Sequence, residues 1–135
     1  LDVGTGSGIL MIAAAKLGAR HLFGLDNDEV AIKVSQKNLL KNDIPADMVD
    51  LKFATLDITD PKPFDFIAAN IIAQVIVDII PQISARTTKD TIIVLSGIIK
   101  ERLNDVILAL KANDLLIIDK EHQDEWVALA VKKKT

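Results

Sequence analysis

The stretch that decides the fold stands at the start of the chain and reads Leu1-Asp2-Val3-Gly4-Thr5-Gly6-Ser7-Gly8. Its first three residues predict a short strand, and the apolar run at residues 9–17 predicts a helix. Glycine lets the backbone turn sharply and leaves no Cβ where a ligand touches the main chain. The N–H groups at a helix start can bind a carboxylate or a phosphate. Three glycines at alternate positions in this setting therefore predict a ligand-binding loop rather than a plain tight turn.

The spacing of the glycines restricts the class of ligand. The dinucleotide fingerprint Gly-x-Gly-x-x-Gly, started at Gly4, needs its third glycine at position 9, which is Ile9. A nucleotide-triphosphate loop is excluded because no Gly-Lys-Ser/Thr follows. Asp26 comes 22 residues after Gly4, at the end of the predicted strand 21–25. A carboxylate there can accept both hydroxyls of a ribose, in S-adenosylmethionine or in NAD. The alternative is a helix N-cap, which Asn27 or Asp28 could also supply.

The rest of the chain alternates helices and strands. The predicted elements are a helix at 29–41, a strand at 48–56, a linker at 57–63, a strand at 64–69, a helix at 72–80 that breaks or kinks at Pro81, a strand at 91–95, a helix at 100–112, and strands at 115–119 and 126–131. Only six residues separate the last two strands, which is too few for a parallel crossover. They should form an antiparallel hairpin, the feature that separates the methyltransferase fold from the NAD-binding fold.

Composition agrees with one α/β domain. Half of the 135 residues are hydrophobic, as expected for a parallel sheet with helices on both faces. The helix at 9–17 is apolar all round and is expected to be buried. The absence of cysteine is compatible with a reducing cytoplasm, and a net charge of −3 argues against a nucleic-acid partner. The region 66–80 is too short and too polar to span a membrane. Neither histidine suggests a metal site.

Two polar residues further along the chain are candidates for the site. Asp57, after the third strand, is placed to contact an adenine amino group, with Leu56 or Ile58 packing on the ring; an ordinary loop acid is the alternative. Asn70 follows the fourth strand, at the sheet edge where open α/β sheets bind ligands. It either caps the next helix or faces the substrate, and we favour the second. Trp126 is expected to pack at the hairpin, with His122 in its loop.

Five short blocks give the chain a family resemblance. They are Leu1 to Leu10, Gly24-Leu25-Asp26-Asn27-Asp28, Ala69-Asn70-Ile71-Ile72-Ala73, Leu95-Ser96-Gly97-Ile98 and Glu125-Trp126. Together they resemble the bacterial methyltransferase of protein eleven of the large ribosomal subunit, over the whole chain. The first two blocks occur in many class I methyltransferases, and the other three narrow the resemblance to this family. It implies a Rossmann-like class I methyltransferase fold, mostly parallel, with an antiparallel C-terminal hairpin strand and helices on both faces.

The resemblance also implies an activity. The enzyme would act in the cytoplasm, use S-adenosylmethionine, and methylate lysine side chains and an α-amine of one ribosomal protein, without metal. Residues 1–135 would form the cofactor-binding domain, and the family's upstream substrate-recognition domain would be missing. The candidate catalytic residue is Asn70, and the candidate cofactor-binding residues are Asp2, Gly4, Thr5, Gly6, Asp26, Asn27, Asp57 and Asn70. The alternatives are a small-molecule amine methyltransferase, a non-catalytic cofactor-binding fragment, and an NAD-dependent oxidoreductase domain.

Overall fold

The computed structural model describes residues 1–135. They form two compact units, Leu1–Thr59 and Asp60–Thr135, which are described in turn. The first unit contains β1 (Asp2–Val3), α1 (Ile9–Lys16), β2 (Leu22–Asp26), α2 (Glu29–Lys41), the 3-10 turn η1 (Ala46–Met48), β3 (Val49–Phe53) and the 3-10 turn η2 (Leu56–Ile58).

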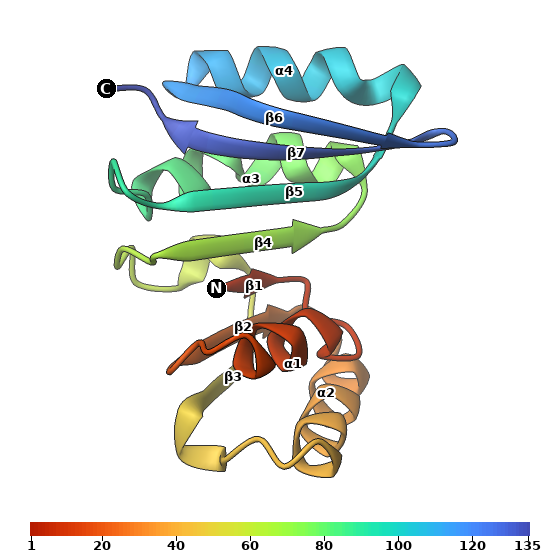
Figure 1. The fold of residues 1–135 in the computed structure, drawn as a ribbon, viewed down its shortest axis with the longest axis vertical. Coiled ribbons are helices and arrows are strands. Elements are labelled where there is room, and N and C mark those ends of the chain that lie inside the picture. The colour runs from red at the N-terminus through yellow and green to blue at the C-terminus, as the bar shows by residue number, and fades with distance from the viewer. The chain divides into compact units, whose positions relative to one another are not determined.

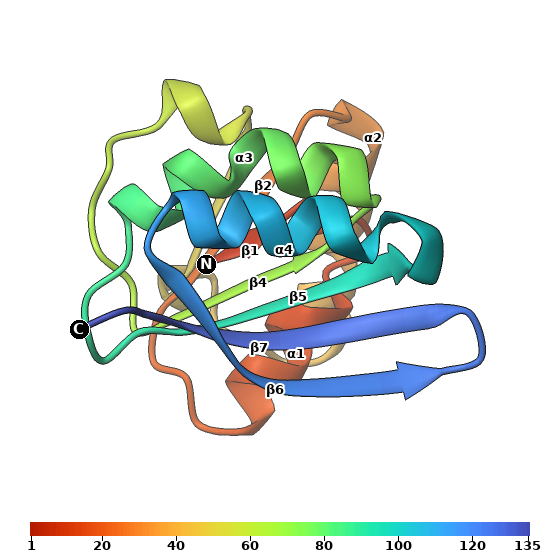
Figure 2. The same cartoon turned by 90° about the horizontal axis from the view of Figure 1, so that it is seen from above.

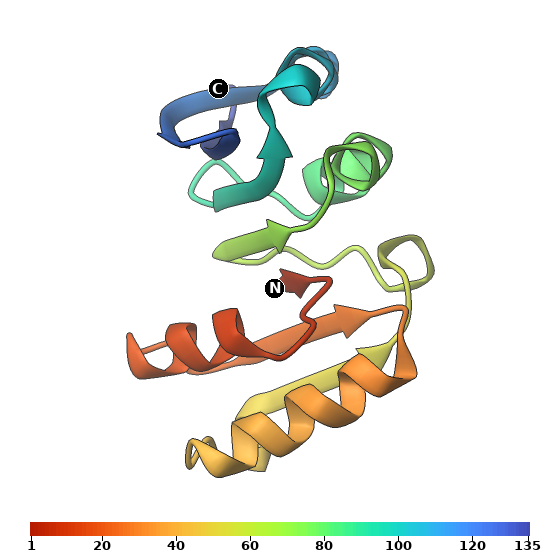
Figure 3. The ribbon, with the colours of Figure 1, turned by 90° about the vertical axis from the view of Figure 1, so that its right-hand side faces the viewer.

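Three parallel strands form the sheet of the first unit, in the order β3-β2-β1. Asp26 pairs with Phe53 at its carboxyl edge. Helices α1 and α2 lie beside the strands in Figure 1 and Figure 3, and one apolar cluster joins them to β2. Its buried members are Met11, Leu22, Leu39 and Ile44. Burial of this cluster fixes the helix that follows the glycine loop.

Helix α1 is not buried all round, so that expectation is wrong. Met11 is its one buried residue, whereas the side chains of Ile9 and Leu17, which follows the helix, are 66% and 88% exposed. A helix of eight residues lying on β2 and α2 needs only one stripe of contacts, and the stripe consists of Met11, Ile12, Ala14 and Ala15. The remaining apolar side chains stay at the surface. Strand β3 also ends earlier than predicted, at Phe53.

The second unit contains β4 (Phe66–Asn70), α3 (Ala73–Ala85), β5 (Ile92–Ile99), the 3-10 turn η3 (Lys100–Arg102), α4 (Leu103–Ala112), β6 (Leu115–Gln123) and β7 (Trp126–Lys133). Its strand order is β4-β5-β7-β6, with β4 parallel to β5 and with β7 antiparallel to both of its neighbours (Figure 2). The predicted hairpin is confirmed. Its last strand lies inside the sheet, between β5 and β6.

The hairpin is longer than the apolar pattern predicts. Only Asp124 and Glu125 separate β6 from β7, and Asp124 adopts a φ of 54° at the turn. The polar residues before it remain paired with β7, down to Gln123 opposite Trp126. His122 is therefore a strand residue, not a loop residue. The apolar pattern ends at residue 119, so it predicts only the part of β6 that has apolar side chains. Backbone pairing with β7 continues to Gln123, where the strand ends.

Helix α3 runs through Pro81 to Ala85 without ending there. Proline removes one backbone donor, but the fully buried Ile80 and Ile83 hold the helix against the core on both sides of it.

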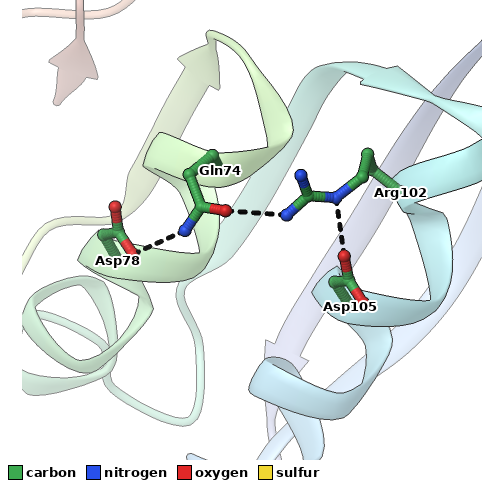
Figure 4. Close-up of polar contacts among 4 residues, drawn as sticks. All are labelled: Gln74, Asp78, Arg102 and Asp105. Carbon is green, nitrogen blue, oxygen red and sulfur yellow. Dashed lines mark hydrogen bonds and ion pairs between the residues drawn. The ribbon is translucent and has the colours of Figure 1, made fainter.

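A chain of side-chain hydrogen bonds joins the exposed face of α3 to the start of α4 (Figure 4). Arg102 Nη2 donates to Gln74 Oε1 at 2.7 Å, and Gln74 Nε2 donates to Asp78 Oδ1 at 3.0 Å. No helix of the protein is both long and apolar enough to cross a membrane.

Candidate functional site

The glycine loop takes the conformation that its sequence requires. Gly4, Gly6 and Gly8 have φ values of 72°, 54° and 81°, in the left-handed region that strains other residues. A Cβ on Gly8 would lie 3.0 Å from the Cβ of Ser35, so α2 packs closely there. A Cβ on Gly6 would have no neighbour within 4 Å. The loop is therefore packed at Gly8 and open at Gly6, where a ligand can reach the backbone.

Several backbone donors of the loop are already used within the protein. The N–H groups of Gly4 and Thr5 both donate to Leu25 O at 2.9 Å, and that of Gly8 donates to Thr5 O at 2.8 Å. These bonds fix the loop to the end of β2. Gly8 is the N-cap of α1 and supplies no side-chain acceptor. The donors left for an anionic ligand group are those of the first turn of α1.

Asp26 is tied to the same loop. Its Oδ2 accepts from Gly6 N at 2.9 Å and its Oδ1 accepts from Asp28 N at 2.9 Å. The N-cap of α2 is Asp28, whose Oδ1 accepts from Val30 N at 2.8 Å. Asp26 is thus not the N-cap. Each carboxylate oxygen can accept a second hydrogen bond, so the half-buried Asp26 can still bind hydroxyl groups.

Asp2 carries the strongest sign of a ligand. It is only 5% exposed, and neither its Oδ1 nor its Oδ2 has a hydrogen-bond partner. The equally buried Thr5 Oγ1 beside it is also unpartnered. Burial raises the pKa of Asp2 above its usual value, and the neighbouring Thr5 opposes the rise. A buried polar group without a partner is costly. A cationic ligand group would satisfy Asp2 and offset that cost.

The other two candidates of this unit lie on its surface. Asn27 follows β2, and Asp57 lies in η2; both side chains are exposed. Of the residues expected to pack on an adenine ring, Leu56 is buried and Ile58 is 71% exposed, so only Ile58 is accessible. The first unit therefore holds seven of the eight candidate cofactor-binding residues, and the ligand roles of Asn27 and Asp57 stay predictions.

Asn70 lies in the second unit, where it lines a pocket of about 680 Å³. It is the last residue of β4, and its side chain is exposed. The N-cap of α3 is Ile72, which has no side-chain cap. The helix-cap alternative for Asn70 is therefore wrong, and the amide is free to face the pocket.

A β-bulge in β5 determines how closely the segment that begins at Asn70 approaches β5. The register with β7 shifts between Leu95 and Ile98, and Gly97 has a φ of 79°. A Cβ on Gly97 would lie 2.7 Å from Ile71 O and 3.1 Å from Asn70 Oδ1. The loop after β4 can therefore lie against β5 only because residue 97 is glycine. The spacing of residues alone did not assign this role to Gly97.

The hairpin supplies the rest of the pocket. Glu121, His122 and Gln123 of β6 and Trp126 of β7 line it together with Asn70. Trp126 lines the pocket and is 48% exposed, so it does not pack in the core. The sequence predicts that Trp126 lies at the hairpin, but not that it shares a pocket with Asn70, because that depends on β7 lying beside β5. No group of His, Asp and Glu residues is placed to hold a metal ion.

Comparison with known proteins gives the family. A family model described as "Ribosomal protein L11 methyltransferase (PrmA)" matches residues 1–134. The chain belongs to the ribosomal protein L11 methyltransferase family. A family relative from Desulforapulum autotrophicum is 47% identical over 132 residues, which are 98% of this chain and 44% of that protein. One from Fusobacterium nucleatum is 37% identical, over 99% of this chain and 43% of that protein. The chain thus spans less than half the length of these L11 methyltransferases.

Solved structures confirm the predicted fold class. The crystal structure of ribosomal protein L11 methylase from Lactobacillus delbrueckii subsp. bulgaricus matches with a TM-score of 0.94 and 36% identity, over 99% of this chain and 69% of that chain. A putative methyltransferase from Thermoplasma acidophilum shares the fold, with a TM-score of 0.84 at 15% identity, over 99% of this chain and 67% of that one. The Rossmann-like class I methyltransferase fold, mostly parallel with an antiparallel C-terminal hairpin strand, is therefore established for this member of the L11 methyltransferase family.

Proposed function

We propose that residues 1–135 are the S-adenosylmethionine-binding domain of a cytoplasmic N-methyltransferase, which methylates lysine side chains and an α-amine of ribosomal protein L11. Membership of the L11 methyltransferase family supports the substrate. The observation that carries the proposal within this chain is the buried, unpartnered carboxylate of Asp2, just before the glycine loop that is open at Gly6. A cofactor with an ammonium group, a carboxylate and a ribose matches the groups available there.

In this proposal, different residues of the first unit bind different parts of the cofactor. Asp2 binds the α-ammonium of the methionine part, and the first-turn N–H groups of α1 bind its carboxylate. Asp26 accepts the ribose hydroxyls while it holds Gly6, and Asn27 flanks the ribose. Asp57 accepts from the adenine amino group. When bound, the cofactor supplies a methyl group on a positively charged sulfur, which is electrophilic without further activation.

The pocket of the second unit would bind the amine. A lysine amine has a reference pKa of ~10.4 and must be neutral to react. The apolar walls formed by Ile71, Val127 and the Trp126 ring disfavour the charged form. Asn70, through its side-chain or backbone carbonyl oxygen, accepts one amine N–H and directs the lone pair. Orientation of this kind accounts for most of what such an enzyme must contribute.

The proposal is tested by two measurements. Calorimetry of the chain with S-adenosylmethionine, S-adenosylhomocysteine and NAD should give saturable binding of the two adenosyl ligands only. Labelled methyl transfer by the protein in its full natural length should modify ribosomal protein L11. Binding of NAD alone would favour an oxidoreductase domain. Adenosyl binding with transfer only to small amines, or with no transfer, would favour the small-molecule enzyme or the non-catalytic alternative.

A further inference from the structure

The side chains that line the pocket around Asn70 include a negative charge but no lysine or arginine to balance it. Among the lining residues, Glu121 is the only one with a carboxylate. The side chain of Glu121 is exposed, and no ion pair neutralises it. A pocket of about 680 Å³ falls in the size range of sites for drug-sized ligands, roughly 300–1,000 Å³. It is therefore larger than one amine side chain requires.

The surroundings reinforce this charge. The outer half of the hairpin exposes four carboxylates, on Asp119, Glu121, Asp124 and Glu125. Two ammonium groups lie near them, on Lys120 and on Lys100, whose backbone N donates to Glu125 O at 3.0 Å. Carboxylates without ion partners repel one another, and they attract a cationic partner from solution. The hairpin tip thus favours approach of a basic segment and disfavours an acidic one.

The register of the hairpin places Glu121 relative to the ring of Trp126. Gln123 pairs directly with Trp126, and Glu121 pairs with Ala128. Residues two apart on a strand project to the same face, so Glu121 is the diagonal neighbour of Trp126, at about 7–8 Å. Alternate residues of an extended peptide are separated by a similar distance, about 6.6 Å, since each residue rises about 3.3 Å.

Glu121 is unsuited to hold the reacting amine itself. A carboxylate beside an amine stabilises its ammonium form and raises its pKa, whereas methyl transfer needs the neutral amine. The same carboxylate is well suited to a second cation that does not react. The separation of Glu121 and Trp126 is close to the spacing of alternate side chains in an extended peptide. When the target lysine lies at Trp126, the side chain two residues away can therefore place its cation at Glu121.

We propose that Glu121 forms a second subsite, which binds the ammonium or guanidinium group of a basic residue two positions from the methylated lysine in an extended segment. The inference rests on the proposed function, because it takes the Asn70 and Trp126 pocket as the amine site. It adds a substrate preference: basic segments are favoured over those with a single lysine, and an acidic residue at the second position is rejected.

The test uses the 135-residue chain saturated with S-adenosylhomocysteine and two blocked peptide probes, Lys-Ala-Lys and Lys-Ala-Ala. NMR titration gives both dissociation constants. The wild-type chain should bind Lys-Ala-Lys about twofold to fivefold more tightly, as expected for an exposed ion pair, and the preference should fade at high salt. Glu121→Gln, which keeps the shape and removes the charge, should abolish the preference, so that the two peptides bind with equal dissociation constants.

Asp124→Asn is the matched control. It removes the same charge at the same hairpin tip but lies outside the pocket lining, and asparagine tolerates the left-handed φ of residue 124. It should keep the preference for Lys-Ala-Lys. If Glu121→Gln and Asp124→Asn lost the preference for Lys-Ala-Lys equally, the cause would be diffuse attraction by the hairpin tip. If the wild-type chain showed no preference, there would be no subsite. Either result overturns the inference. Failure of the chain to bind S-adenosylhomocysteine, measured first, would instead count against the proposed function.

Discussion

Replacing Asp2 with asparagine should weaken cofactor binding and leave the fold as stable as before, or more so. Asparagine has nearly the same shape but no charge. A hydrogen bond that involves a charged group contributes about 1.5–3 kcal/mol. The dissociation constant for S-adenosylhomocysteine should therefore rise about tenfold to a hundredfold. Calorimetry measures the affinity, and a thermal melt of the unliganded chain measures the stability.

The two readouts are expected to move in opposite directions because Asp2 is buried and unpartnered in the unliganded chain. Burial raises its folded pKa above the usual value of 3.8, so the charged form is destabilising when the pH exceeds that raised pKa. The stability difference between Asp2→Asn and wild type should be largest at neutral pH. It should vanish as the pH falls through the raised pKa toward 3.8. Over the same window the wild-type chain should lose affinity for the cofactor, since a protonated Asp2 cannot pair with an ammonium group.

Asp28→Asn serves as the control for charge alone. Asp28 lies at the same sheet edge, caps α2 and is exposed, and asparagine is an equally good N-cap. Its affinity for S-adenosylhomocysteine should stay close to that of the wild type. Unchanged affinity in Asp2→Asn, or a clear drop in its melting temperature with normal binding, would show that Asp2 has a structural role and would refute its assignment to the ammonium group.

Four further outcomes are expected. Asp26→Ala should weaken S-adenosylhomocysteine binding about tenfold to a hundredfold through a lost charged hydrogen bond, and calorimetry that finds normal affinity would remove the ribose role. Asn70→Ala should lower the rate of methyl transfer at saturating cofactor more than it lowers cofactor affinity; unchanged turnover would exclude Asn70 from amine orientation. Gly97→Ala forces a Cβ to 2.7 Å from Ile71 O, so it should slow methyl transfer by displacing Asn70 while S-adenosylhomocysteine affinity is kept, and Ser96→Ala, without that clash, should not. The isolated chain should bind cofactor but methylate ribosomal protein L11 far more slowly than the full natural protein, and equal rates would place substrate recognition within residues 1–135.

The parts of the site that the sequence predicted are those built from local spacing. A strand, three alternating glycines and a helix are contiguous, so the loop conformation follows from residues 1–17 alone. The role of Asp26 was harder to predict, because a carboxylate at a strand end can cap a helix or bind a ribose. Only the folded structure assigns the two tasks: Asp28 is the N-cap of α2, and Asp26 accepts from Gly6 N. Local sequence gives the residue types of such an edge, and hydrogen bonding decides between their roles.

The amine pocket could not be predicted in the same way, because no stretch of sequence contains it. Asn70 and Trp126 are 56 positions apart in the chain, and they share a pocket only because β7 inserts between β5 and β6. The polar run that ends β6 looked like a loop, since solvent-facing strand residues and loop residues have similar compositions. Backbone pairing with β7 extends it into a strand, and that extension brings Glu121 beside the pocket. The substrate preference proposed for Glu121 is therefore a property of strand register. Shifting the pairing of β6 by one residue would turn Glu121 to the other face and present Lys120 in its place.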